Sequence, residues 1–142
     1  MKKITIIGQL AAKFGRVILN NAAIRSMMCR KEAEDADTVL IMEHWTARKG
    51  WTEDLSLEEV SEKLGLSKED LSRYFRLHAG KNFLQWRRAI RIEEAKRQLL
   101  ENKNIPTAFI GESVGIPDKS NFRRQFKRET GYTPAEWRRL KH

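Results

Sequence analysis

Hydrophobic residues recur at three- and four-residue intervals from about residue 37 to the end of the chain, which is the spacing of amphipathic helices. The longest such run covers 83–101, where Trp86, Ile90 and Leu99 fall on one helical face. No segment after residue 37 has the pattern of paired strands. This part of the chain is therefore predicted to be helical throughout.

Capping residues mark the ends of these helices. Ser56 and Glu59 form a Ser-x-x-Glu capping box, and Thr133, Pro134 and Glu136 combine an N-cap, a proline at the first helical position and a reciprocal acidic residue. The expected helices, about seven in all, run from about 37 to 49, Leu57 to Gly65, Ser67 to Gly80, 83 to 101, Pro106 to Gly115, Asp118 or Ser120 to Gly131, and from Thr133 onward.

One helical unit occurs twice, first at 64–88 and again at 114–139 with a one-residue insertion. Gly65 corresponds to Gly115 at an offset of 50. At an offset of 51, Leu71, Phe75, Gly80 and Trp86 correspond to Phe122, Phe126, Gly131 and Trp137. A helix, a glycine turn and a second helix make a helix-turn-helix. The fold class is thus predicted to be all-α, with two helix-turn-helix subdomains joined by a long linker helix.

Two segments of different character make up the predicted domain organisation. Residues 1–35 show no clear hydrophobic period, so this extension could be a strand, a helix or a tail. We expect it to be dispensable for binding by the repeated domain. The polar, acidic stretch 33–37 is interpreted as a boundary. Residues 36–142 then form the repeated domain, with its first helix-turn-helix at about 37–82, the linker helix at about 83–101 and the second helix-turn-helix at about 104–142.

The second helix of each unit has a predicted exposed face. Leu71 and Phe75 lie four residues apart and define an inward side, as do Phe122 and Phe126. The opposite side of the first helix offers Glu69, Ser72, Arg73 and Arg76, with Asp70 beside them. The opposite side of the second offers Lys119, Ser120, Asn121, Arg123, Arg124 and Lys127. Such side chains reach base edges and phosphates in a major groove, which predicts sequence-specific binding of double-stranded DNA.

Charge supports a polyanionic partner. The chain carries a net charge of +9. Residues 55–82 hold five basic and five acidic residues, whereas residues 104–142 hold eight basic and four acidic ones, so we expect the second unit to dominate binding. The linker helix of 19 residues would be about 28 Å long. That length suits two recognition helices in major grooves about 34–36 Å apart, which one monomer could then occupy.

Other classes of function find little support. The single Cys29 excludes an internal disulfide and points to the cytoplasm, and His44, His78 and His142 have no metal-ligand spacing. There is no glycine-rich phosphate loop and no Ser/His/Asp order, so we expect no enzyme, no cofactor and no metal. No apolar run approaches a membrane span. The alternative is a helical protein-interaction module that uses the same fold without DNA.

An ordered set of residues extends over the second half of the chain: Arg91, Ala95, Leu99-Leu100, Gly115, Asn121-Phe122, Arg124, Phe126-Lys127, Gly131, Thr133-Pro134 and Trp137-Arg138. This set resembles the pattern of the AraC/XylS family of bacterial transcription regulators. The resemblance implies promoter DNA and RNA polymerase as partners, and activation of transcription. Two positions depart from the family, which commonly has Ala at Gly111 and Phe at Ile116. We expect Gly111 to loosen its helix by about 0.5–1 kcal/mol relative to Ala. A separate sensor domain is absent, so the chain is a stand-alone member or a piece of a larger protein.

Overall fold

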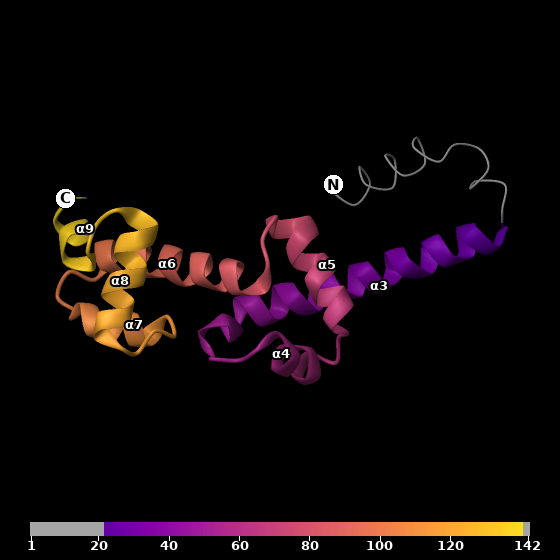
Figure 1. Ribbon diagram of the computed structural model, residues 1–142, viewed down its shortest axis with the longest axis horizontal. Helices are drawn as coiled ribbons and strands as arrows, with labels where there is room; N and C mark the ends of the chain where they lie inside the picture. Colours follow the sequence, from indigo (N-terminus) through magenta and orange to yellow (C-terminus); the bar gives the residue numbers. More distant parts are fainter. Residues whose placement is uncertain (1–21, 141–142) are drawn as a thin grey trace. The chain divides into compact units, whose positions relative to one another are not determined.

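The computed structural model describes residues 22–140, and every regular element in that stretch is helical (Figure 1). The elements are α3 (Ala22–Ala47), the 3-10 turn η1 (Gly50–Thr52), α4 (Leu57–Leu64), α5 (Lys68–Ala79), α6 (Phe83–Glu101), α7 (Thr107–Ser113), α8 (Lys119–Thr130) and α9 (Pro134–Leu140). The predicted all-α class is confirmed, and the helix expected at 83–101 is present as α6. Within these described residues, no helix combines the length and the apolar character needed to cross a membrane.

The first helix begins earlier than expected. The prediction placed its start near residue 37, but α3 begins at Ala22 and continues through the acidic stretch 33–37. The reason is that residues 22–47 contain no Gly or Pro and are rich in good helix formers, so solvent-exposed polar residues do not end the helix. The chain divides into compact units at 1–39 and 40–142. In the first, Thr38 Oγ1 donates to the carbonyl oxygen of Glu34 at 3.0 Å.

The expected helix caps are present in the compact unit formed by residues 40–142. The Ser56 N–H donates to Glu59 Oε2 at 2.7 Å and the Glu59 N–H donates to Ser56 Oγ at 3.2 Å, so the capping box is complete. The same reciprocal pair joins Thr133 and Glu136 at the start of α9. At α5, Ser67 caps the helix. Local side-chain chemistry therefore fixes where three of the helices begin.

The N-terminal caps of two further helices were established only by the structure. The expected start of α8 was open between Asp118 and Ser120, and Asp118 is the cap, because its Oδ1 accepts from the Asn121 N–H at 2.7 Å. At α6, Asn82 and Gln85 form a third complete capping box. This cap was not among the predicted ones, although the pair has the required spacing of three residues.

Aromatic side chains fill the core on both sides of the linker helix. Phe75 of α5 packs between Phe83 and Trp86, with ring centroids 5.5 and 5.1 Å apart. Phe126 of α8 packs on Phe122 and Trp137 at 5.8 and 6.0 Å. Leu71, Phe75, Phe122 and Phe126 are all buried, as the repeat predicted. Helices α5 and α8 are thus each held by their inward side, which leaves the opposite side exposed.

Gly111 was expected to make its helix less stable than Ala would, but its surroundings indicate that Ala does not fit. It is buried in α7, and a Cβ there would lie 2.8 Å from Cγ of Phe122 and 2.9 Å from the backbone oxygen of Ile116. Neither atom is the end of a flexible side chain, so the space is too small for Ala. The expectation that Ala would tighten this helix is therefore wrong, because close packing outweighs propensity.

We expect Gly111→Ala to destabilise the protein by about 1–3 kcal/mol, the usual cost of overpacking a core. Urea unfolding followed by circular dichroism would measure this cost. Glu112→Ala is the matched control, since Glu112 is an exposed neighbour in the same helix. A Gly111→Ala protein as stable as the control would show that Phe122 moves aside without cost.

Candidate nucleic-acid interface

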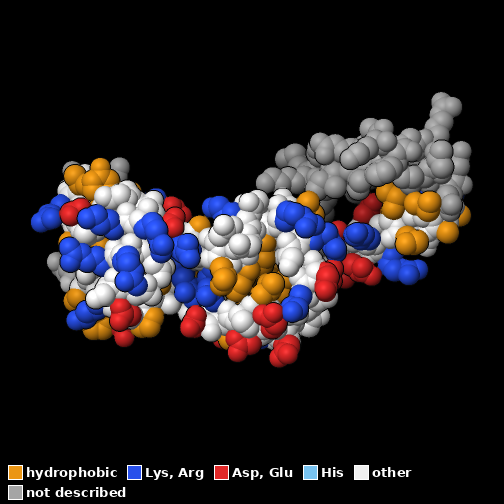
Figure 2. Space-filling view, viewed as in Figure 1, with side chains coloured by type: hydrophobic (Ala, Val, Ile, Leu, Met, Phe, Trp, Pro, Cys, Tyr) orange, Lys and Arg blue, Asp and Glu red, His pale blue; other side chains and the backbone are white. Residues whose placement is uncertain are grey.

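The outer side of α8 is exposed and strongly basic. Lys and Arg side chains crowd the surface over α8, whereas acidic side chains gather over α4 (Figure 2). The predicted residues Lys119, Ser120, Arg123, Arg124 and Lys127 are all exposed. Arg128 is exposed as well and was not predicted, although it follows Lys127 directly. The structure therefore brings five basic side chains onto one helix of 12 residues.

Asn121 is less accessible than its neighbours on α8. It is half-buried, and its Oδ1 accepts from Arg124 Nη2 at 3.2 Å and from Gln125 Nε2 at 3.0 Å. Asn121 was predicted as a contact residue in its own right. In the structure, its side chain connects Arg124 to the helix, which favours one orientation of that guanidinium.

The corresponding side of α5 differs in charge. Glu69, Ser72 and Arg76 are exposed, as predicted. Arg73 is only partly exposed, and its Nη2 donates to Asp70 Oδ1 at 2.7 Å, with side-chain exposures of 20% and 28%. Asp70 thus neutralises an arginine at the position that corresponds to Arg124 of α8. The first unit presents less positive charge to a polyanion than the second.

Helices α5 and α8 lie near opposite ends of α6 (Figure 1). With its 19 residues, this helix is about 28 Å long. Its own charges are mostly paired: Glu94 accepts from Arg97 Nη2 at 2.6 Å and from Gln98 Nε2 at 3.0 Å. These bonds, above all the one from Arg97, lower the pKa of Glu94 to about 2. The helix is therefore a charged but internally compensated connection between the two units.

Several arginines bind backbone oxygens instead of facing solvent. Arg91 is buried, and it donates from Nε to the Trp51 carbonyl at 2.8 Å and from Nη2 to the Glu53 carbonyl at 3.0 Å. Burial lowers its pKa to about 10, with Arg87 as the second cause, so it stays charged at neutral pH. The sequence indicated Arg91 only as part of a family signature. A basic residue between Ile90 and Ile92 was the available sign of a buried role.

Arg87 and Arg138 have the same kind of role. Arg87 donates to the Leu55 carbonyl at 2.7 Å. Arg138 of α9 donates to three carbonyls near the end of α6, at 3.3, 3.1 and 2.6 Å, namely those of Leu99, Asn102 and Ile105. These arginines count toward the net charge of the chain but stabilise loops. Among the described helices, α8 carries the most exposed basic residues, five in all.

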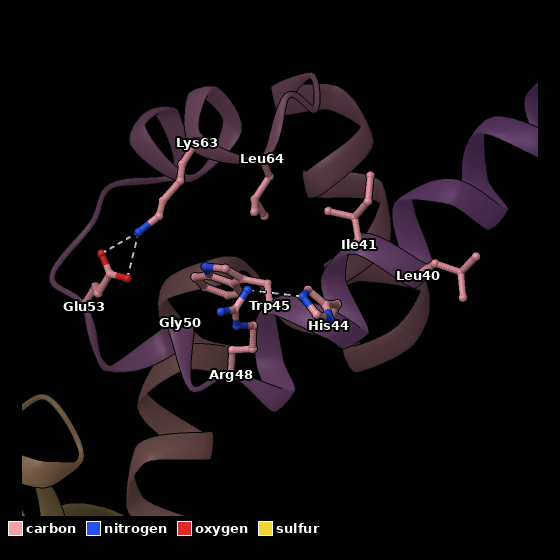
Figure 3. A pocket seen from close by; sticks show the side chains of 9 residues that line it. All are labelled: Leu40, Ile41, His44, Trp45, Arg48, Gly50, Glu53, Lys63 and Leu64. Atoms are coloured by element: carbon pink, nitrogen blue, oxygen red, sulfur yellow. Dashed lines mark hydrogen bonds and ion pairs between the residues drawn. The ribbon is translucent and has the colours of Figure 1, made fainter.

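The loop at η1 is also held from the side of α4. Lys63 Nζ contacts both carboxylate oxygens of Glu53 at 2.8 Å (Figure 3). These two residues line a hollow of about 660 Å³ between α3, η1 and α4, in which the Trp45 ring lies against Gly50. Lys49 has a φ of 59° just before the turn, a conformation that non-glycine residues rarely adopt. The loop thus contacts α4 through Lys63 as well as α6 through Arg91.

Comparison with known proteins places this arrangement in a family. The sequence profile of a helix-turn-helix domain family matches residues 60–140. The arabinose operon regulatory protein of Escherichia coli is 38% identical over 85 residues, which are 60% of this chain and 29% of that protein. The multiple antibiotic resistance protein MarA of Salmonella typhimurium is 33% identical over 93 residues, 62% of this chain and 72% of that protein.

A solved structure agrees with the fold. The C-terminal domain of the two-component response regulator yesN from Fusobacterium nucleatum has a TM-score of 0.61 and 31% identity, covering 72% of this chain and 98% of that one. The chain spans under a third of the length of the arabinose operon regulators it matches, at 29%. The matched region contains both repeated units and the linker helix. The chain therefore belongs to the AraC/XylS family of DNA-binding transcription regulators.

Proposed function

We propose that this chain binds a specific double-stranded DNA sequence as a monomer, with α5 and α8 in two adjacent major-groove segments. The observation that carries the proposal is the repetition of one design. Each of these helices buries two apolar residues on one side, exposes polar and charged residues on the other, and lies near one end of the rigid helix α6. Such a spacing suits grooves one helical turn apart.

Within this proposal, α8 supplies most of the affinity. Its exposed side carries basic residues with no carboxylate beside Arg124, whereas α5 carries Glu69 at its start and pairs Arg73 with Asp70. Phosphates line both edges of a groove, so a carboxylate there is repelled unless it accepts from a cytosine amino group.

We further propose that the bound protein activates transcription through contact with RNA polymerase. The support is membership of a family of transcription regulators. Transcription in vitro from a promoter carrying the selected site, with purified polymerase, would test this. Activation should require both the site and the protein, and a decrease in transcript would identify a repressor.

The binding proposal is tested by selecting sites from random duplexes and footprinting the best one. The footprint should cover two major-groove segments about 10 base pairs apart, centre to centre. Affinity should fall by orders of magnitude between about 50 and 200 mM salt. Protection of one segment alone, or binding that needs a two-fold symmetric site, contradicts the monomer proposal. Absence of salt-dependent binding favours a protein-interaction module.

Substitutions in the two recognition helices should have unequal effects. Arg124→Ala should weaken binding by about 1–3 kcal/mol and relax base preference at one position. Lys127→Ala should weaken binding to all sequences and lower the salt slope by about one. Arg73→Ala, the matched substitution in α5, should cost less, because Asp70 already occupies that guanidinium. Titrations of one labelled site at one salt concentration measure all three. A loss at Arg73 equal to that at Arg124 overturns the ranking.

A further inference from the structure

Three successive carbonyl groups of the η1 loop contact two different parts of the molecule. Arg91 of α6 binds the outer two, those of Trp51 and Glu53, at 2.8 and 3.0 Å. The middle one, that of Thr52, points to Gly115, where a Cβ would lie only 2.4 Å from it. The same Cβ would lie 3.0 Å from Cζ of Arg91. One guanidinium therefore contacts the η1 loop and the turn of the second helix-turn-helix together.

This contact joins the two halves of the DNA-binding domain. The η1 loop leads from α3 into the first helix-turn-helix, and Gly115 is the turn of the second, just before α8. Helix α6 already connects the halves, but a single helix leaves rotation about its ends to be restrained by packing. The two directed hydrogen bonds of Arg91 hold the η1 loop in place, and Gly115 packs directly against that loop and against the guanidinium, so they restrain the second half through the position of the loop.

We propose that Arg91 is a positioning residue that fixes the angular phase of α8 relative to α5, and thereby selects the spacing between the two half-sites on DNA. The proposal rests on the proposed function, since it assumes that both helices bind the same duplex. Arg91 itself is buried and lies away from solvent, so its effect on DNA is indirect.

Spacing selectivity gives the proposal its test. One inserted base pair shifts the second half-site by about 3.4 Å and rotates it by roughly a tenth of a turn. The wild-type protein should lose about tenfold or more in affinity for duplexes with one base pair added or removed between half-sites, comparable to a mismatched base pair. Arg91→Lys keeps the charge but cannot bind both carbonyls in the same planar geometry. Its loss on the altered duplexes should fall to about threefold or less, because a looser α8 can follow the shifted groove.

Arg138→Lys is the matched control. It removes the same kind of arginine-to-carbonyl bonds, but their acceptors, Leu99, Asn102 and Ile105, lie outside the η1 loop. It should lower thermal stability and leave spacing selectivity at the wild-type value. Unchanged selectivity in Arg91→Lys overturns the proposal, as does an equal loss of selectivity in both variants, which would show a general effect of stability.

A measurement without DNA keeps the proposal separate from the proposed function. Exposed Ser72 of α5 and Arg123 of α8 can be replaced by Cys for spin labels, with the exposed Cys29 changed to Ser. The distribution of label distances should broaden in Arg91→Lys and stay narrow in Arg138→Lys. A narrow distribution in Arg91→Lys overturns the positioning role. Broadening in a protein whose wild type shows no spacing selectivity would refute the two-groove binding mode instead.

Discussion

Replacing Phe126 by Ala should remove about 3–5 kcal/mol from the free energy of unfolding. Phe126 is fully buried, and its ring contacts those of Phe122 and Trp137. Truncation loses the transfer free energy of the ring and leaves a cavity between α8 and α9. Since a small domain has only about 5–15 kcal/mol in total, at least the second helix-turn-helix should unfold. Thermal denaturation followed by near-ultraviolet circular dichroism would measure the loss.

Phe109→Ala provides the control for this prediction. Phe109 has the same side chain and lies in the same half of the domain, but it is 62% exposed on α7. Its removal should change stability by no more than about 0.5 kcal/mol, as for a surface substitution. A melting temperature for Phe126→Ala close to that of Phe109→Ala would mean that the inward side of α8 is assigned incorrectly.

The two turn glycines of the repeat should respond very differently to the same substitution. Gly65 and Gly115 have φ values of 66° and 88°, so Ala at either position costs about 1–2 kcal/mol of backbone strain. At Gly115 the new Cβ would also meet the Thr52 oxygen at 2.4 Å. That overlap should add about 1–3 kcal/mol, because the oxygen belongs to backbone that Arg91 holds in place.

At Gly65 a Cβ would have nothing within 4 Å, so Gly65→Ala measures the strain alone. Chemical denaturation of both variants at one temperature gives the difference directly. Equal losses would mean that the η1 loop shifts away from Gly115 at little cost, and the close approach would then not restrain the two halves.

Local sequence rules predicted the helices of the repeated domain well. Capping residues, glycine turns and the spacing of Phe122 and Phe126 each depend on neighbours within a few positions, and the structure confirms them. The start of α3 was wrong because a polar stretch ends a helix only if its residues also disfavour helical backbone. Gly111 was misjudged because its neighbour Ile116 and the Phe122 ring approach it through tertiary packing, which propensity does not describe.

For the predicted contact residues, too, features set by neighbours along the chain were predictable, and features set by tertiary contacts were not. Exposure followed from helical periodicity for most of them. The pairing of Arg73 with Asp70 was foreseeable from their spacing of three residues. The buried role of Arg91 depends on carbonyls 38 and 40 residues away along the chain. No periodic pattern contains that information.

Arginine bonds to main-chain oxygens have a consequence for how the domain tolerates sequence change. A carbonyl group is present whatever side chain its residue carries. Exposed positions such as Glu53 and Asp54 can therefore change their side chains while Arg91 and Arg87 keep their main-chain partners. For these bonds, the arginine side chains must be kept, whereas the side chains of the loop residues can vary. An engineer could vary this loop, or the exposed side of α8, to alter the surface of the protein without dismantling the frame that aligns its two halves.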